Sequence, residues 1–268
     1  MFAYAEQPKI SIITSLYKGE EFIEGFMETV VQQTVFDKCE LIIINANSPE
    51  NEGVVIKRYL EKYPNIFYFQ LVEDPGLYAT WNIGIEIAQG EFITNANVDD
   101  RVSCDCYEKH LKALEENEDI DLVYSDFYLT CTPNETFEQN NASWAKVNPD
   151  FSVENMKDCF TGPNPMWRKS VHEKYGLFDE SYKHSGDWEM WCRAVAGGAK
   201  FLRVDGCHCL YFLNPKGVST DREKIESIIE EDRRVVRQYK YLWEKEEMPE
   251  VKKEVDIGGL FEEELDEE

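Results

Sequence analysis

Short runs rich in β-branched residues alternate with segments of helical periodicity along the N-terminal part of the chain, and this alternation constrains the fold more than any other feature. The expected strands are residues 10–17, 40–47, 66–74 and 91–97, and the expected helices are residues 20–36, 54–64 and 77–90. Three strand-helix units in a row, followed by a fourth strand, are typical of a parallel sheet. The sequence therefore predicts an α/β fold in which helices flank a central sheet that is mostly parallel and Rossmann-like.

Length and composition allow one large domain, or one domain with appendages. The chain has 268 residues, 43% of them hydrophobic, which is enough to bury a full core. No apolar run approaches the roughly 20 residues that span a membrane, and the start MFAYAEQPKI lacks the basic and apolar segments of a signal peptide. A net charge of -25 would repel nucleic acid. We therefore expect a cytoplasmic protein with no transmembrane segment and no nucleic-acid partner.

Eight cysteines are present, and the lack of a secretion signal favours reduced thiols over disulfides. Cys104 with Cys106, and Cys207 with Cys209 around His208, raise the question of a zinc site. The spacing argues against it, because zinc knuckles place two residues between paired cysteines. Cys207 and Cys209 would also share one face of a strand without any metal. We expect the thiols to be structural.

Polar or glycine-containing segments follow each of the four expected strands. They are TSLYKGEE, NANSPENEG, EDPG and the pair Asp99 and Asp100. Because ligands bind beyond the carboxyl ends of parallel strands, these segments predict a ligand crevice at one edge of the sheet. No glycine-rich phosphate-binding motif is present, so a phosphorylated ligand would need another partner. The two acids could be turn or cap residues, or they could hold a divalent cation that bridges to a diphosphate.

The order of these segments resembles one enzyme family. SIITSLYKGEEFI, ELIIINANSPENEG, EDPGLYATWNIGIEIAQGEFI and NVDDR resemble the nucleotide-sugar-binding half of the family 2 glycosyltransferases, which are inverting enzymes with the GT-A fold. GPNPMWRKSVHEKYGLFDESYKHSGDWEMWCRAVAGGAKF resembles their acceptor-binding half. The resemblance implies a GT-A domain over residues 1–220, with a nucleotide-sugar-binding half at about 8–101 and an acceptor-binding half at 102–220.

The resemblance also implies roles for individual residues. It places Asp99 and Asp100 of NVDD on a divalent metal, Mn²⁺ or Mg²⁺, that binds the diphosphate of the donor. It makes Asp187 of GDWEMW the general base that deprotonates the acceptor hydroxyl. The residues that it assigns to the nucleotide-sugar donor are Thr14, Ser15, Tyr17, Glu20, Asp74, Gly76, Asn82, Asn97 and Asp99. The metal would stabilise charge on the leaving phosphate, while the carboxylate takes the proton.

Three positions depart from the family's pattern. Relatives carry Asp-Asp-Gly-Ser after the second strand, whereas this chain carries NANS, with Ala46 at the position of the carboxylate that reads the nucleobase. Either Asn45 or Asn47 replaces that carboxylate in the donor site, or the donor is not a uridine nucleotide; a UDP-sugar is the first expectation. Asn97 stands at the first acid of the metal motif. Asn214 stands where many relatives have a metal-assisting histidine, which leaves the third protein ligand open.

Aromatic residues in the expected acceptor half suggest how the acceptor is held. Trp167 and Trp188 could stack on a sugar face and His184 could touch the acceptor, although all three also fit ordinary core or surface roles. Asp187 has a second interpretation as a helix N-cap, because Gly186 followed by Asp187 is also good helix-start chemistry. The expected acceptor is a hydroxyl of a glycan, of a lipid-linked acceptor or of a protein.

A charged helix and an acidic tail are expected after the domain. Residues 221–247 carry an apolar stripe that should pack on the domain or on a partner, which includes a second copy of the chain. The acidic face of this helix argues against direct membrane binding and leaves peripheral membrane contact through another protein open. Trp243 to Glu268 contain twelve acids and three lysines, a net charge of -9, so residues 248–268 should form a flexible acidic tail.

Two functions are consistent with these features. The first is a metal-dependent glycosyltransferase of the hexosyltransferase type, acting in polysaccharide biosynthesis. The second is a non-catalytic relative that binds a nucleotide sugar or a glycan. The presence of Asp99, Asp100 and Asp187 together favours the transferase.

Overall fold

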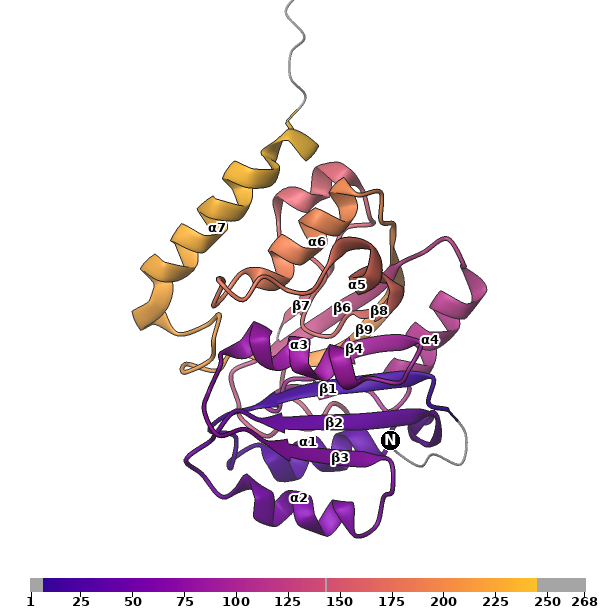
Figure 1. The fold of residues 1–268 in the computed structure, drawn as a ribbon, viewed down its shortest axis with the longest axis vertical. Coiled ribbons are helices and arrows are strands. Elements are labelled where there is room, and N and C mark those ends of the chain that lie inside the picture. Colours follow the sequence, from indigo (N-terminus) through magenta and orange to yellow (C-terminus); the bar gives the residue numbers. More distant parts are fainter. Residues whose placement is uncertain (1–6, 143, 245–268) are drawn as a thin grey trace, which may run out of the picture.

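The computed structural model describes residues 7–142 and 144–244, which form a nine-stranded sheet with helices on both faces (Figure 1). The strands are β1 (Ile10–Leu16), β2 (Cys39–Asn45), β3 (Ile66–Gln70), β4 (Phe92–Asn95), β5 (Arg101–Val102), β6 (Leu122–Thr130), β7 (Trp144–Lys146), β8 (Met166–Arg168) and β9 (Phe201–Phe212). The α-helices are α1 (Ile23–Val31), α2 (Glu52–Leu60), α3 (Leu77–Ile87), α4 (Cys106–Glu116), α5 (Ser170–Tyr175), α6 (Gly186–Ala196) and α7 (Ile225–Tyr239). Short 3-10 helices are η1 (Phe36–Lys38), η2 (Val153–Lys157), η3 (Arg222–Lys224) and η4 (Lys240–Leu242). Among the described residues, no helix combines the length and apolarity needed to cross a bilayer.

The sheet changes character along its width. Its strand order is β3-β2-β1-β4-β8-β6-β9-β5, with β7 paired to β6. β1 pairs in parallel with β2 and β4, and β2 pairs in parallel with β3, as the alternating pattern predicts. Beyond β4 the pairing is mixed. β8 pairs antiparallel with β4 and β6, and β5 pairs antiparallel with β9, whereas β6 and β9 are parallel. The predicted α/β fold is confirmed, and its sheet is parallel in the N-terminal part and mixed beyond it.

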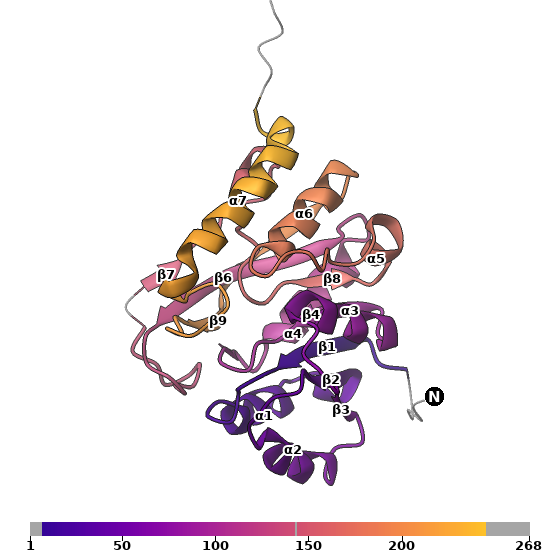
Figure 2. The same ribbon diagram turned by 60° about the vertical axis from the view of Figure 1, so that its left-hand side comes forward.

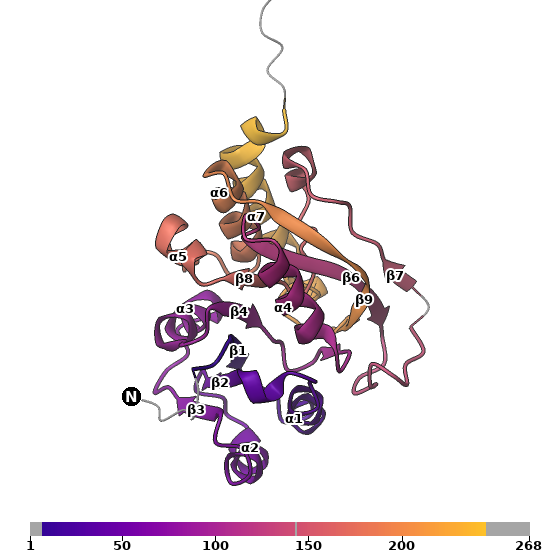
Figure 3. The ribbon, with the colours of Figure 1, turned by 90° about the vertical axis from the view of Figure 1, so that its right-hand side faces the viewer.

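β2 shows why both faces of the sheet are covered. Its residues 41–44 are all aliphatic and fully buried. Leu41 and Ile43 face a core formed with α1, α2 and α4, whereas Ile42 and Ile44 face a second core formed with α3, α5, α6 and α7. Continuous apolar runs of this kind are typical of strands buried between two helical layers. Figure 3 shows α1 and α2 on one side of the first three strands and α3 on the other.

α7 packs along α6 through one face (Figure 2). Val235 and Tyr239 on that face are buried in the same core as α6, whereas Ile225 and Ile229 near the start of α7 are exposed. The predicted packing of the apolar stripe on the domain is therefore confirmed for the second half of α7. The helix is shorter than the sequence suggested, and residues 245–268, which include the predicted acidic tail, lie outside the described residues.

Candidate functional site

A large cavity opens at the carboxyl ends of the parallel strands, where the sequence predicts a ligand crevice. Its volume is about 940 Å³, which suits a small-molecule ligand. The residues that line it include Ser15, Tyr17, Asp74, Asn97, Asp99, His184, Asp187, Trp188, Asn214 and Lys216. The cavity therefore joins the loops that follow β1, β3 and β4 to the start of α6 and to the segment after β9.

Asp187 lies in the first turn of α6, in the wall of the cavity. Its Oδ1 accepts a hydrogen bond from the backbone N–H of Trp188 at 2.9 Å and lies 3.3 Å from the Tyr78 hydroxyl. That hydroxyl donates more closely to the carbonyl oxygen of His184, at 2.8 Å. Burial raises the pKa of Asp187 above its ordinary value, and the hydrogen bonds from Trp188 and Tyr78 oppose that shift. A carboxylate with a raised pKa is a better proton acceptor near neutral pH.

Gly186 permits the close approach of Tyr78 to the start of α6. A Cβ atom at Gly186 would lie 2.6 Å from a carbon of the Tyr78 ring, so a larger residue would displace the ring. The N-cap residue of α6 is Ser185, two positions before Asp187. Asp187 is therefore not the N-cap residue, although its carboxylate accepts a hydrogen bond from the N–H of Trp188 in the first turn of α6. The same carboxylate lies beside the cavity and the Tyr78 hydroxyl.

The two acids of NVDD have different partners. Asp99 lines the cavity, and its Oδ2 accepts a hydrogen bond from Asn214 Nδ2 at 2.8 Å. Asp100 is 7% exposed, and its Oδ1 accepts from the backbone N–H of Phe212 at 3.0 Å. Asn97 Nδ2 donates to Asp100 Oδ2, also at 3.0 Å. Burial, together with the neighbouring charge of Asp99, raises the pKa of Asp100 well above its ordinary value.

These contacts correct the expectation for Asp100. Both of its carboxylate oxygens accept hydrogen bonds from the protein, and the residue is not among those that line the large cavity. Its side chain joins the loop after β4 to the end of β9. Asp100 is therefore buried and held by protein donors, and it does not lie on an exposed loop as the sequence suggested.

The carboxylate of Asp99 could hold a cation that is shared with a bound ligand. Within the part of the chain that the structure describes, no group of three His, Cys, Asp or Glu side chains could hold a metal ion, at the cysteine pairs or elsewhere. Asp99 is the acid of NVDD that lines the cavity. Mg²⁺ in phosphate sites commonly takes one or two carboxylates together with substrate oxygens and water. The arrangement therefore suits a hard divalent cation that arrives with a diphosphate.

Three residues predicted for the donor lie in the cavity wall on the side of β1 and α3, namely Ser15, Tyr17 and Asp74. Asp74 Oδ1 accepts a hydrogen bond from the N–H of Gly76 at 2.8 Å. Gly76 has a φ of 93°, a conformation that favours glycine, and it is the N-cap residue of α3. Ala46 also lines the cavity, at the position where the family resemblance places a carboxylate. The loops after β1, β2 and β3 therefore meet at one end of the cavity.

Other residues predicted for the donor do not line the cavity. They are Thr14, Glu20, Asn45, Asn47, Gly76 and Asn82. Thr14 and Asn45 are buried, and Asn45 Nδ2 donates to the Tyr68 hydroxyl at 2.9 Å. Asn82 Nδ2 donates to the carbonyl oxygen of Phe178 at 2.9 Å, and Asn82 Oδ1 accepts from the N–H of Phe178 at 3.0 Å. Asn82 thus joins α3 to the segment between α5 and α6.

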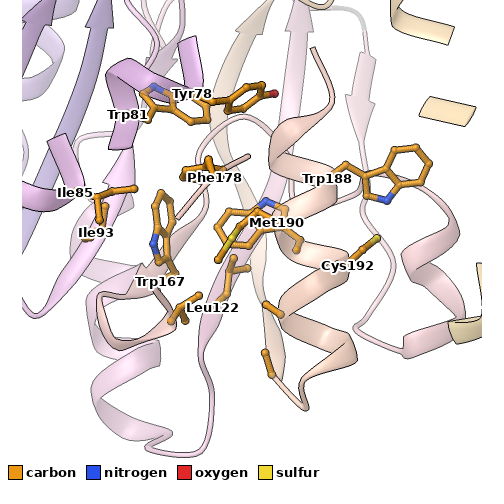
Figure 4. Packing of buried hydrophobic residues seen from close by; sticks show 14 of the residues in the cluster. Tyr78, Trp81, Ile85, Ile93, Leu122, Trp167, Phe178, Trp188, Met190 and Cys192 are labelled. Carbon is orange, nitrogen blue, oxygen red and sulfur yellow. The ribbon is translucent and has the colours of Figure 1, made fainter. Parts of the chain in front are cut away.

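Trp188 and Trp167, both predicted to contact the acceptor, lie in different places (Figure 4). Trp188 lines the cavity and donates from Nε1 to the carbonyl oxygen of Met156 at 2.9 Å. Trp167 is 1% exposed, and its Nε1 donates to His172 Nε2 at 2.9 Å. Its ring meets Phe178 edge to face in the core. The expectation for Trp167 is therefore corrected, because its ring is a core residue with no face open to the cavity.

The structure adds cavity residues that the sequence did not single out. Tyr78 and Asp232 line the cavity, and the charge of Asp232 acts on Asp187. Four lysines also line it, namely Lys18, Lys146, Lys216 and Lys224. Lys224 pairs with Asp221, which also lines the cavity, at 3.3 Å. In a chain with a net charge of -25, Lys18, Lys146 and Lys216 provide local positive charge for an anionic ligand. Lys18 follows β1 and Lys216 follows β9, so their places after strand ends are the signal that could have identified them.

Comparisons with known proteins agree on one family. A family profile described as Glycosyl transferase family 2 matches residues 11–176. The chain is similar to the uncharacterized glycosyltransferase MJ1057 of Methanocaldococcus jannaschii, with 24% identity over 209 residues, 75% of this chain and 69% of that protein. It is 25% identical over 221 residues to the uncharacterized glycosyltransferase EpsJ of Bacillus subtilis, which covers 79% of this chain and 63% of that protein. The chain thus spans about two thirds of the length of these relatives.

Solved structures share the fold. S. aureus TarS 1–349 in complex with UDP-GlcNAc superposes with a TM-score of 0.68 at 14% identity, covering 88% of this chain and 70% of that one. The mannosyltransferase PcManGT from Pyrobaculum calidifontis, in complex with GDP-Man and Mn²⁺, gives a TM-score of 0.67 at 14% identity, covering 87% of this chain and 65% of that one. Together with the observed sheet, these likenesses confirm the predicted GT-A fold with a C-terminal helix.

Proposed function

The chain belongs to glycosyl transferase family 2, and we propose that it transfers a sugar from a nucleoside diphosphate donor to an acceptor hydroxyl, with inversion at the anomeric carbon. One observation carries the proposal. Asp99 and Asp187 line the same cavity, although one follows β4 and the other begins α6. Such a transfer requires a carboxylate that holds a cation on the diphosphate and a base that takes the proton of the acceptor hydroxyl.

Asp187 takes the proton of the acceptor hydroxyl while the hydroxyl oxygen forms a bond to the anomeric carbon. The bond between that carbon and the diphosphate oxygen breaks on the opposite side, and the nucleoside diphosphate leaves with the electron pair. Attack opposite to the leaving group inverts the anomeric centre. The raised pKa of Asp187, caused mainly by burial, supports its role as base, and the Tyr78 hydroxyl 3.3 Å away helps to orient the carboxylate.

Negative charge that develops on the leaving diphosphate needs stabilisation in this cavity. Lys18 and Lys216 line the cavity and supply positive charge. Asp99 would hold a divalent cation together with the diphosphate oxygens, and this cation would act as a Lewis acid on the leaving phosphate. The Mn²⁺ in the PcManGT complex supports the choice of Mn²⁺ or Mg²⁺. Asn214 donates to Asp99 and orients its carboxylate.

The nucleoside is proposed to bind between the loops after β1 and β2, near Tyr17 and Ala46. Asn45 and Asn47 do not line the cavity, so neither side chain replaces the carboxylate that reads the nucleobase in relatives. Glu50, on the same loop, does line the cavity and offers a carboxylate to the nucleobase. A UDP-sugar is the first candidate donor, and the UDP-GlcNAc in the TarS complex supports it. GDP-Man in the PcManGT complex makes a guanosine donor the first alternative.

The acceptor is proposed to bind beside Asp187, where Trp188 and His184 line the cavity. Trp188 is 7% exposed, and the part of its indole in the cavity wall provides an apolar contact for a sugar ring. His184 Nδ1 lies 2.8 Å from the carbonyl oxygen of Val218, which holds the imidazole at the cavity edge. A hydroxyl of a glycan, of a lipid-linked acceptor or of a protein fits this chemistry.

A screen of UDP-, GDP- and dTDP-sugars with Mn²⁺ tests the proposed donor class, because a ligand that binds the folded state raises the melting temperature. The donor that stabilises the protein is then assayed for hydrolysis and for transfer to candidate acceptors. Turnover supports the transferase. Stable donor binding without turnover under any acceptor would favour the non-catalytic relative, which the departures at Ala46 and Asn97 keep as the second candidate.

A further inference from the structure

The carboxylate of Glu231 in α7 accepts hydrogen bonds from three successive backbone N–H groups just before α6. Its Oε2 accepts from Lys183 at 3.1 Å, from His184 at 2.8 Å and from Ser185 at 3.1 Å, and its Oε1 accepts from Lys183 at 2.9 Å. Successive N–H groups that converge on one point form an anion-binding nest. Hydrogen bonds to an ionised acceptor are stronger than those between neutral groups. An acid of the C-terminal helix therefore holds the segment that leads to Asp187.

Two further side chains of α7 hold the same segment. Asp232 Oδ1 accepts a hydrogen bond from Ser185 Oγ at 2.6 Å. The Arg234 guanidinium lies 4.0 Å from the centroid of the Tyr182 ring and donates to Ser181 Oγ at 2.9 Å. Neighbouring side chains of one helix therefore contact residues 181–185 along their whole length.

The segment is also held from the opposite side, by α3. Tyr78 donates to the carbonyl oxygen of His184 at 2.8 Å, and its hydroxyl lies 3.3 Å from Asp187 Oδ1. Ser185, the last residue that Glu231 contacts, is separated from Asp187 by Gly186 alone. A shift of about 1 Å in a reacting group can cost about 10²-fold in rate. A small movement of the backbone at residues 183–185 would therefore displace Asp187 enough to slow transfer.

We propose that Glu231 is a positioning residue for Asp187. Its carboxylate fixes the backbone at residues 183–185, which makes α7 a component of the active site. This inference rests on the proposed function, because it requires Asp187 to act as the base. Glu231 itself is not among the residues that line the cavity, so it acts through the segment. Val235 and Tyr239 bury α7 against the domain, so the helix stays docked when the carboxylate is changed.

The variant Glu231→Gln tests the proposal, because it removes the charge and turns one acceptor oxygen into an N–H donor facing other N–H groups. Glu230→Gln is the matched control, since the side chain of Glu230 is 61% exposed and pairs with Arg237. With the full chain and a screened donor and acceptor, kcat should fall by roughly 10- to 100-fold in Glu231→Gln, while the donor KM stays within about twofold. Glu230→Gln should match the wild type in both constants.

Hydrogen exchange adds a readout that does not depend on turnover. The amides of residues 183–185 should exchange faster in Glu231→Gln than in the wild type, at a temperature well below both melting transitions. Exchange elsewhere in the chain should stay the same. Unchanged exchange at these amides would overturn the claim that Glu231 fixes them, and faster exchange throughout the chain would indicate a global loss of stability that contradicts a local role.

A double-mutant cycle separates this inference from the proposed function. If Glu231 acts through Asp187, adding Glu231→Gln to Asp187→Asn should not lower transfer further. An equal further loss in both backgrounds would overturn the positioning role. A normal rate in Glu231→Gln beside an impaired Asp187→Asn would overturn the positioning role alone, whereas normal transfer by Asp187→Asn would remove the base assignment itself.

Discussion

Asn214 Nδ2 donates a hydrogen bond of 2.8 Å to Asp99 Oδ2 and thereby ties the segment after β9 to the loop after β4. The other end of the same amide, Asn214 Oδ1, accepts from the backbone N–H of Lys216 at 3.0 Å. Asn214 stands where the family resemblance places a metal-assisting histidine. In this chain the residue instead orients Asp99 and the turn that carries Lys216.

Replacing Asp99 by Asn should remove most of the cation dependence of donor binding, because a hard divalent cation prefers a carboxylate to an amide. Calorimetric titration of the nucleotide with and without Mn²⁺ measures this dependence. Glu86→Gln is the charge-matched control, since Glu86 is exposed on α3 and is not among the residues that line the cavity. If Asp99→Asn kept the wild-type gain in affinity from Mn²⁺, Asp99 would not be a ligand of the cation.

Asp100→Ala should lower the free energy of unfolding by about 1–3 kcal/mol, because the buried N–H of Phe212 loses its acceptor. Asp100→Asn retains one acceptor oxygen and should cost less. Denaturant unfolding of both variants gives the two free energies, and donor affinity below the melting transition should stay close to that of the wild type. A fully stable Asp100→Ala variant that had lost Mn²⁺-dependent binding would return Asp100 to the metal site.

The acidic limb of the pH profile for transfer should lie above the ordinary Asp pKa of 3.8, because burial, and to a smaller extent the charge of Asp232, raise the pKa of Asp187. Transfer requires the ionised carboxylate, so activity grows as the pH rises through that raised pKa. Asp232→Asn removes one cause of the shift while keeping an oxygen for Ser185 Oγ, and it should move the limb to lower pH. A limb that stayed in place or moved upward would contradict this electrostatic account.

Truncation of the two tryptophans should have different effects. Trp188→Ala should raise the KM for the acceptor with little change in donor affinity, because this indole forms part of the cavity wall. It should also lower the free energy of unfolding, because Trp188 is only 7% exposed. Trp167→Ala should lower the free energy of unfolding by about 3–5 kcal/mol, as large truncations in a core do. Acceptor kinetics and denaturant unfolding are measured on both variants. A normal acceptor KM in Trp188→Ala would exclude that ring from the acceptor site.

The N-terminal part of the fold could be predicted because its signals are local. The aliphatic run of β2 and the helical periodicity that follows it are visible within short windows of sequence. The later strands have no such signal. β8 pairs antiparallel with both β4 and β6, and Leu122 of β6 lies opposite Phe201 of β9, which is far away in sequence. These pairings arise from tertiary contacts, so the mixed part of the sheet could not be predicted from periodicity.

The same limit applies to the candidate site. Asp99 and Asp187 could be identified through the family resemblance, and both line the cavity. Asp99 and Asp100 are equivalent in sequence, but their directions depend on Asn214 and Phe212, which lie 115 and 112 residues away from them. One of the two donors to Asp100 is the backbone N–H of Phe212, and a backbone donor leaves no trace in the pattern of side chains.

The transfer rate and donor affinity of Asp187→Asn, measured on one purified preparation, test the central claim most directly. Asn retains an oxygen for the N–H of Trp188 and for the Tyr78 hydroxyl, so the local structure should persist. It cannot take the proton of the acceptor, so transfer should fall by roughly 10²–10⁴-fold. Donor affinity should barely change, because Asp99 lies in a separate loop. Near-normal transfer by Asp187→Asn would contradict the account and remove Asp187 from the mechanism.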